Sequence, residues 1–116
     1  MRRMTFIMSI KMKQGDVWLA DVLFKDTRQI KQRPVIIVGN ELALDVDVII
    51  APVTSQRPRN QFDVVLEYWE EVGLLKPSVA RTSKITSVHG SELKRYIGAL
   101  HKHDIERVLE MCKKLF

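Results

Sequence analysis

Apolar runs alternate with short polar stretches along most of the chain, and this pattern changes only near the C-terminus. The run "PVIIVGN" is β-branched and continuous, which is typical of a strand buried on both faces or of a barrel wall, and "VDVIIAPVT" predicts a second apolar strand. Shorter runs predict further strands between turn residues. The predicted strands are Val17–Phe24, a run from Pro34 that ends at Gly39-Asn40, Val46–Val53, Phe62–Glu67, "VARTSKI" and "LKRYIGAL".

Polar segments without a period predict the loops. "FKDTRQIKQR" and "TSQRPRNQ" are polar and basic, and we expect both to be loops. Pro34 has no backbone N–H, so we expect it only at the start of its strand. "YWEEVGLLKPS" contains Gly73 and Pro77, which predict a turn with a short helical piece before it.

The C-terminal segment has helical spacing. Asp104 is the predicted N-cap, with acidic Glu106 in the first turn and basic residues in the last turn. Short strands followed by one helix predict a mainly β fold with a C-terminal α-helix, in the form of a small twisted barrel. The apolar stripe of the helix, which we expect to pack on the sheet, consists of Ile105, Val108, Leu109, Cys112 and Phe116.

The length of 116 residues fits a single domain, and no linker or repeat divides the chain. Methionines recur in the first twelve residues, so we expect residues 1–12 to be an extension or an alternative start and residues 13–116 to form the domain. The apolar run Met4–Ile10 is too short for a membrane span or a signal peptide.

Charge and cysteine content narrow the class of partner and the compartment. The formal charge is +5 and the sequence pI is about 9.6, which favours a phosphate-rich partner without proving one. The single cysteine, Cys112, cannot form an intramolecular disulfide, so a reducing cytoplasm is the simplest compartment.

Several kinds of chemistry lack their motifs in this sequence. There is no glycine-rich dinucleotide or phosphate loop, and no serine lies in a nucleophile elbow. His101 and His103 have no further ligand run beside them, so we expect a polar helix entry rather than a metal site. Cys112 lies on the apolar stripe, and core packing is expected for it. His89 is expected at the surface, in a turn. We expect no metal and no cofactor.

What remains is arginine beside hydroxyl groups at strand ends. If a small barrel brings these ends together, the groups form one basic patch, whereas the plainer alternative is a set of solvated loop arginines. Guanidinium forks and hydroxyls suit a phosphodiester and its pentavalent transition state. RNA carries its own nucleophile, the 2′-hydroxyl, so such a patch would need no metal. The candidates are Arg33, Thr54, Ser55, Arg57, Arg59, Arg81 and Ser83, the last two on one face of the strand "ARTS".

The sequence resembles the MazF/PemK-like toxins of bacterial toxin–antitoxin systems. The matching pieces are "KQGDVWLADV", "QRPVIIVGN", "IIAPVTS", "GLLKPSVARTSKI" and "RYIGAL", in family order over roughly residues 13–100. The resemblance implies the SH3-like small β-barrel of the CcdB/MazF/PemK toxins, a homodimer, and metal-independent cleavage of single-stranded mRNA. The 2′-hydroxyl would attack, leaving a 2′,3′-cyclic phosphate and a 5′-hydroxyl, and a cognate antitoxin would inhibit.

The resemblance also implies roles for individual residues. Arg33, before the proline, and Thr54, after "APV", match the catalytic pair: Arg33 would stabilise the phosphorane and protonate the leaving oxygen, and Thr54 would orient the phosphate or the 2′-hydroxyl. Arg81 matches a family arginine, but Ser83 stands where one branch has an aspartate, and the first loop, residues 25–31, has no histidine. The general base therefore stays unassigned. Further substrate-binding candidates are Gln32, Ser55, Arg57, Arg59, Arg81 and Ser83.

Two other functions remain open at this point. The first is a binding module on the same barrel, since a relative in this fold superfamily blocks DNA gyrase instead of cutting RNA; the missing aspartate at Ser83 favours it, and the retained pair Arg33 and Thr54 opposes it. The second is a regulatory domain without an active site. Gyrase supercoiling and growth after induced expression separate these functions from a ribonuclease.

Overall fold

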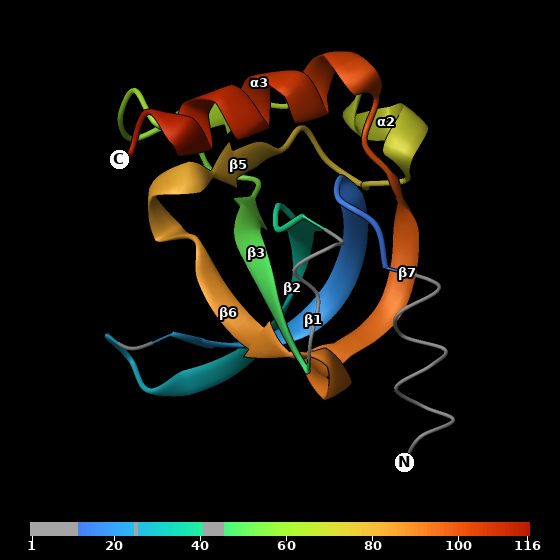
Figure 1. Cartoon of the computed structure of the whole chain (residues 1–116), viewed down its shortest axis with the longest axis vertical. Helices are drawn as coiled ribbons and strands as arrows, with labels where there is room; N and C mark the ends of the chain where they lie inside the picture. Colours follow the sequence, from blue (N-terminus) through green and yellow to red (C-terminus); the bar gives the residue numbers. More distant parts are fainter. Residues whose placement is uncertain (1–11, 25, 41–45) are drawn as a thin grey trace.

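The structure is a computed structural model that describes residues 12–24, 26–40 and 46–116. Within these ranges the chain folds into seven strands and a few helical segments (Figure 1). The strands are β1 (Asp16–Phe24), β2 (Gln29–Ile37), β3 (Asp47–Thr54), β4 (Asp63–Val65), β5 (Val79–Arg81), β6 (Thr86–His89) and β7 (Leu93–Ala99). The helices are α2 (Trp69–Val72), α3 (Lys102–Lys113) and the 3-10 turns η2 (Thr82–Lys84) and η3 (Gly90–Glu92).

The strands form one curved antiparallel sheet. Its order is β4-β5-β3-β2-β1-β7, and β6 pairs with β3 outside this path. Among the described strands, β4 and β7 end the path without pairing with each other, so the barrel-like sheet is not closed. Helix α3 lies across one end of the sheet, with α2 beside it (Figure 1). The predicted mainly β fold with a C-terminal helix is confirmed.

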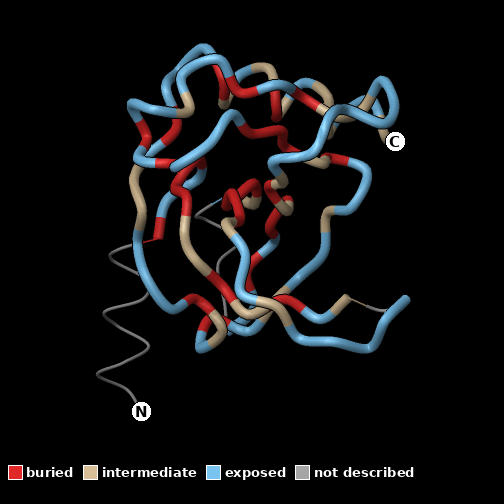
Figure 2. Tube along the Cα trace, turned by 180° about the vertical axis from the view of Figure 1, so that it is seen from behind, coloured by how far each residue is buried: buried red, intermediate tan, exposed pale blue. Residues whose placement is uncertain are grey.

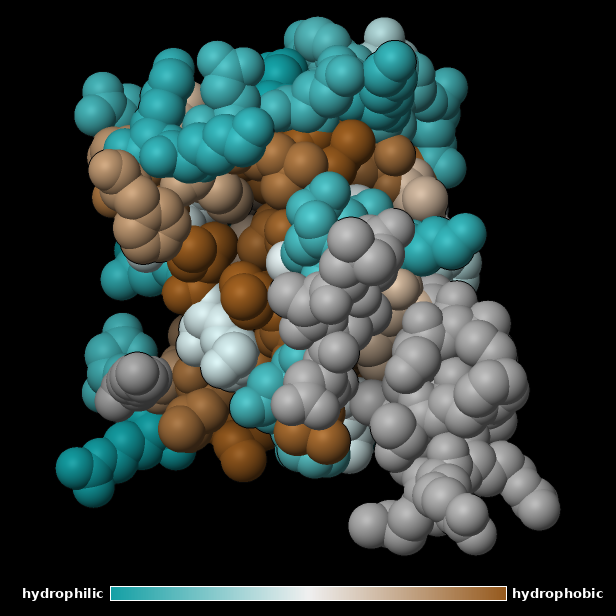
Figure 3. Space-filling model, in the orientation of Figure 1, coloured by the Kyte–Doolittle hydropathy of each residue, from teal (hydrophilic) through white to brown (hydrophobic). Residues whose placement is uncertain are grey.

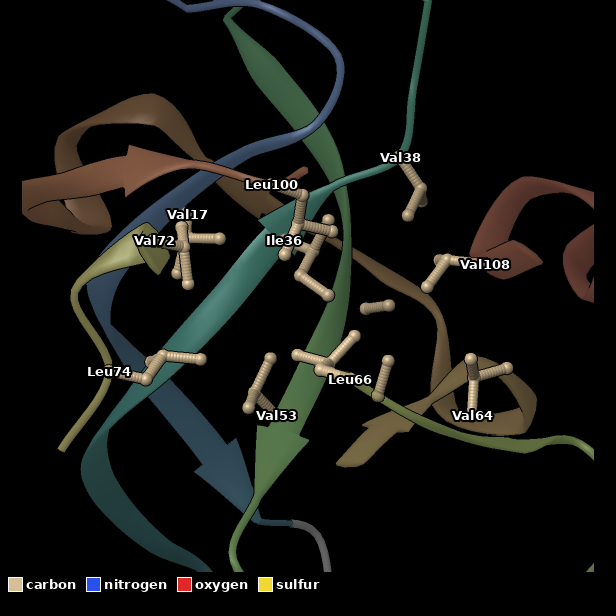
Figure 4. Close-up of a cluster of buried hydrophobic side chains, with 12 residues drawn as sticks. Val17, Ile36, Val38, Val53, Val64, Leu66, Val72, Leu74, Leu100 and Val108 are labelled. Carbon is tan, nitrogen blue, oxygen red and sulfur yellow. The ribbon is translucent and has the colours of Figure 1, made fainter. Parts of the chain in front are cut away.

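Both faces of the central strands are buried. Ile36 belongs to a core cluster that includes Val108 of α3, whereas Val35 and Ile37 belong to a second cluster on the other face of the sheet. Figure 4 shows side chains of the first cluster converging between the strands and α3, and Figure 2 shows the buried backbone concentrated in the middle of the molecule. The prediction of a strand buried on both faces is therefore confirmed for "VIIV", because alternate side chains enter different clusters.

The segment predicted as the loop "FKDTRQIKQR" is largely a strand, and that prediction was wrong. β1 and β2 pair from Val17–Ile36 out to Phe24–Gln29, and their outer ends project from the body as a two-stranded arm (Figures 1 and 2). The arm is mostly exposed, and Lys31 lies 5.2 Å from the centre of the Phe24 ring. The β2 side of this arm, residues 29–33, has no buried side chain, so main-chain pairing holds it and no hydrophobic period marks it in the sequence.

The sequence predicted Pro34 at the start of its strand, and this was wrong, because Pro34 lies inside β2. It stands opposite Leu19 of β1, while the ladder between β2 and β3 begins one residue later, at Val35. The β3-facing edge of β2 is unpaired at Pro34, so the missing N–H breaks no bond to β3.

The predicted strand "VARTSKI" ends early. β5 stops at Arg81, and residues 82–84 form the 3-10 turn η2. The Thr82 hydroxyl is fully buried and donates to the backbone carbonyl of Phe62 at 2.5 Å. This bond turns the chain, and Arg81 and Ser83 therefore do not share a strand face. The sequence also missed β6, and it extended β4 beyond Asp63–Val65.

Helix α3 packs its apolar side on the sheet, as predicted. Val108 is fully buried, and Ile105, Leu109 and Cys112 pack against the same cluster. Figure 3 shows the hydrophilic outer surface of the helix above hydrophobic side chains in the middle of this face. Phe116 is 95% exposed and is not part of the stripe, because the helix ends at Lys113 and the helical spacing does not continue to the last residue.

Asp104 is not the N-cap of α3. His101 holds that position, where its Nδ1 accepts from the His103 N–H at 3.0 Å. Asp104 is fully buried, and its carboxylate accepts from the backbone N–H groups of Glu67 and Tyr68 at 3.0 and 2.9 Å. The guanidinium of Arg107 lies 3.3 Å from the same carboxylate. Asp104 thus joins α3 to the segment that leads from β4 into α2.

Helix α2 packs very closely on β7. A Cβ at Gly98 would lie 2.1 Å from the carbonyl oxygen of Val72, so only glycine fits there. Gly73 ends α2 in the left-handed conformation, with φ of 105°, and its own Cβ position lies 3.3 Å from Ile97. These contacts fix where the chain emerges from α2.

The predicted extension, residues 1–12, lies outside the described residues except for Met12. Met12 is 3% exposed and belongs to the second core cluster. None of the helices in the described ranges is long and apolar enough to cross a membrane.

Replacing Asp104 by alanine should destabilise the fold by about 3 kcal/mol, because it leaves backbone N–H groups of residues 67 and 68 without their acceptor. Urea unfolding of Asp104→Ala measures this loss. Glu106→Ala is the matched control on the exposed side of the same helix, and it should change stability by less than about 0.5 kcal/mol. Equal stabilities of the two variants would contradict the account of Asp104.

Gly98→Ala should cost about 2 kcal/mol or more, because the new methyl group forces α2 away from β7. Thermal unfolding of this variant is compared with that of Ala99→Ser, a change at an exposed neighbour in the same strand. An unchanged melting temperature for Gly98→Ala would show that α2 does not depend on this close contact.

Candidate active site

One cleft lies where the middle of β2 and the end of β3 meet the segment that follows α2. Its volume is about 660 Å³. Leu19, Pro34, Val53, Leu74 and Ile97 supply apolar surface to it. Polar groups lie among these apolar ones, and they come from four separate parts of the chain: Arg33 of β2, the residues Thr54, Ser55 and Gln56 at the end of β3, the residues Lys76 and Ser78 after α2, and Arg95 of β7.

Arg33 and Thr54 line the same cleft from neighbouring strands. The β2–β3 ladder ends at the pair Val35–Pro52, and Arg33 lies two residues before this pair on β2 while Thr54 lies two residues after it on β3. Both residues line the cleft. The two groups that the sequence analysis paired therefore belong to one site.

The side chains of this pair are available for contacts with a ligand. Arg33 is exposed, and its guanidinium donates to the carbonyl of Gln32 at 3.0 Å. Thr54 is half-buried, and its hydroxyl oxygen accepts from the Gln56 N–H at 3.2 Å. That bond holds the oxygen in place and leaves the hydroxyl hydrogen free to be donated.

Ser55 also lines the cleft, but the other sequence candidates do not. Arg57 is exposed on the loop after β3, and Arg59 bonds the side chain of Gln56 at 3.0 Å. Gln32 contributes its carbonyl to Arg33, as described above. Arg81 is 17% exposed and lies 3.8 Å from the carboxylate of Asp63, and Ser83 is on η2. Neither Arg81 nor Ser83 lines this cleft, and the two do not share a strand face because β5 ends at Arg81.

Two cations of the cleft were missed by sequence reasoning. Lys76 lies in "GLLKPS" and Arg95 in "LKRYIGAL", pieces that carried the family resemblance but were given no role. Arg95 stands opposite Leu19, which in turn stands opposite Pro34. Its place in the cleft therefore follows from the pairing of three strands, which no local pattern in the sequence shows.

The charge in the cleft has one sign. Among the described residues that line it, Arg33, Lys76 and Arg95 are cations and no carboxylate is present. An anion in the cleft would therefore meet attraction from several sides, at a site partly shielded from water.

One cluster of possible metal ligands and the single cysteine have structural roles rather than chemical ones. Ligand atoms of Glu67, His103 and Asp104 lie within 4.8 Å of one another, but Arg107 lies 3.3 Å from Asp104 and 3.8 Å from Glu67, so a fixed cation already compensates both carboxylates. Burial raises the pKa of the Cys112 thiol. It packs against the core, as predicted, and a protonated thiol is a poor nucleophile.

The comparisons with known proteins agree with this fold. The family model "PemK-like, MazF-like toxin of type II toxin-antitoxin system" matches residues 13–116. No curated protein matches the chain. Among solved structures, toxin MazF-mt6 of Mycobacterium tuberculosis shares 24% identity, with a TM-score of 0.70 over 85% of this chain and 93% of that one.

Two other structures from mycobacterial species are similar. An endoribonuclease shares 17% identity, with a TM-score of 0.72 over 89% of this chain and 88% of its own. An endoribonuclease in complex with its cognate antitoxin shares 18% identity, with a TM-score of 0.71 over 90% of this chain and 97% of its own. At these identities the likeness shows the fold, while the family match spans nearly the whole described domain. The chain belongs to the PemK-like, MazF-like toxins of type II toxin–antitoxin systems.

Proposed function

We propose that this toxin is a metal-independent endoribonuclease that cleaves single-stranded mRNA in the cytoplasm. The observation that carries the proposal is the presence of both Arg33 and Thr54 in the lining of one cationic cleft. The endoribonuclease function of structurally similar proteins supports it. RNA supplies the nucleophile for such a reaction, and the protein supplies charge and position.

The reaction is an internal transfer. The 2′-hydroxyl of the substrate loses its proton to water and its oxygen attacks the adjacent phosphorus. The bond from phosphorus to the 5′-oxygen breaks, and the leaving 5′-oxygen takes up a proton. The products are a 2′,3′-cyclic phosphate and a 5′-hydroxyl. Negative charge increases on the phosphoryl oxygens in the transition state, where donors fixed in advance are most effective.

Arg33 is proposed to stabilise this negative charge. Its guanidinium offers several N–H donors in a planar fork, which can contact a phosphoryl oxygen and the leaving 5′-oxygen at once. Thr54 is proposed to donate its hydroxyl to the same phosphate and so orient it. Ser55 follows Thr54 in the cleft and is proposed to bind substrate next to the scissile phosphate.

The proposed partners are a cognate antitoxin and a second copy of the chain. One structurally similar endoribonuclease is known in complex with its cognate antitoxin. The cationic cleft would attract an acidic segment of such a protein, which would then cover the site and exclude RNA.

Arg33→Ala should lower kcat/KM for RNA cleavage by about 10²–10³-fold, because it removes a donor to the transition-state charge. The measurement is cleavage of a long single-stranded RNA in EDTA, with the product ends mapped. Thr54→Val, which keeps the side-chain shape, should lower the rate by a smaller factor.

Arg57→Ala is the control, because Arg57 lies outside the cleft, and it should cleave at close to the wild-type rate. Equal activity of Arg33→Ala and wild type would overturn the proposed role of Arg33. Intact RNA with inhibited gyrase supercoiling would support the binding-module alternative.

An acidic antitoxin segment should compete with RNA for the cleft. The protein encoded beside this toxin, added in increasing amounts, should raise the apparent KM for RNA while leaving kcat unchanged at saturating substrate. A fall in kcat with constant KM would show that the antitoxin acts away from the cleft.

A further inference from the structure

We propose that Lys76 and Arg95 form a second phosphate subsite in the cleft, so that the cleft holds a nucleotide unit between two phosphates. The inference rests on the proposed ribonuclease function and assigns a role to two cations that the catalytic proposal does not use. The scissile phosphate lies at the edge formed by Arg33 and Thr54. The neighbouring phosphate lies on the other side of the apolar surface that Leu19 and Pro34 supply to the cleft, which is called the floor below.

The strand register separates Arg95 from the catalytic edge. Pro34, Leu19 and Arg95 form one row across β2, β1 and β7. Neighbouring strands lie about 4.8 Å apart, so the backbone of Arg95 is about 10 Å from that of β2. Leu19 lies between them and presents an apolar side chain to the cleft. We therefore expect Arg95 to bind the phosphate next to the scissile phosphate that Arg33 binds.

The directions of the two arginines also differ. Side chains alternate between the faces of a strand, so Arg33 and Pro34 point to opposite faces of β2. Arg95 shares the face of Pro34 and Leu19 because the three stand opposite one another. Arg33 thus contributes from the rim of the cleft, whereas Arg95 contributes from its floor.

Lys76 lies on the wall that faces this floor. The wall begins at Gly73, whose Cβ position is 3.3 Å from Ile97 of β7, and Ile97 is two residues along the same strand from Arg95. The Ser78 hydroxyl donates to the carbonyl of Lys76 at 2.7 Å, which holds the backbone of this wall. Lys76 and Arg95 are both exposed, and neither forms an ion pair with another described residue.

A phosphate is the ligand that fits these groups. Two cations at a partly enclosed site without a carboxylate attract an anion, and the apolar floor between them and Arg33 suits the ribose and base of one nucleotide. The substrate class is therefore an oligonucleotide with at least one phosphate beside the scissile one, rather than a single nucleotide ester.

The first experiment measures binding without cleavage. Fluorescence anisotropy of random-sequence single-stranded 2′-O-methyl oligonucleotides, over a range of salt concentrations, gives the slope of log K against log salt. The variant that carries both Lys76→Ala and Arg95→Ala should lower the magnitude of this slope by about 0.7, the contribution of one phosphate contact on a single strand, because the two cations bind the same phosphate. Lys84→Ala, which removes an exposed cation outside the cleft, should leave the slope unchanged.

The second experiment locates the phosphate. An RNA oligonucleotide centred on a mapped cleavage site is made with a neutral methylphosphonate at the linkage on the 5′ or the 3′ side of the scissile phosphate. One of these changes should raise the wild-type KM by about tenfold, as expected for a lost charge-assisted contact, with little effect on kcat. The same change should hardly affect the variant that carries both Lys76→Ala and Arg95→Ala, which has already lost that contact.

These results separate the subsite from catalysis. A slope for the variant with both substitutions equal to that of the wild type would overturn the subsite, as would equal methylphosphonate effects on the wild type and this variant. If the variant lowers the slope of the wild type as expected, but the wild type cleaves no RNA, then the proposed ribonuclease function fails and the phosphate subsite stands.

Discussion

The register between β2 and β3 is held by side chains that are buried on both faces of β2. Ile36 is packed in one core cluster, and Val35 and Ile37 are packed in the other. A slip of one residue would exchange these faces and place each side chain in the wrong cluster, so the pairing has a single favourable register. Because Arg33 and Thr54 lie on β2 and β3 two residues from the end of this ladder, their positions at the cleft depend on core packing and not on loop conformation.

The opposite wall of the cleft depends on a separate set of contacts. Asp104 of α3 accepts hydrogen bonds from the segment before α2, and the close contact between Gly98 and Val72 seats α2 on β7. Gly73 then turns the chain toward the cleft. The catalytic edge and the proposed phosphate subsite are thus held by different elements of one fold, and a rigid separation between them would set the position of the RNA backbone.

How far the sequence predicted this molecule depended on whether a feature has a local signature. The apolar runs identified β1, β3 and much of β2 because burial on both faces requires continuous apolar residues. Arg33 and Thr54 were recognisable because each borders such a run. The outer part of β2 was missed, since an exposed arm held by main-chain bonds has no hydrophobic period.

Other features depended on partners distant in the sequence. A carboxylate at the start of a helix looks like a cap, and only the position of Glu67 and Tyr68 shows that Asp104 serves them instead. The sequence predicted Arg81 in the basic patch, whereas in the structure its side chain lies beside the carboxylate of Asp63. Arg95 reaches the cleft through the pairing of three strands.

Double substitution tests the central claim most directly: kcat/KM for RNA cleavage is compared among Arg33→Ala, Thr54→Val and the variant carrying both. If the two side chains act on one phosphate as a unit, the double variant loses about as much as Arg33→Ala alone, whereas losses that multiply would contradict the account.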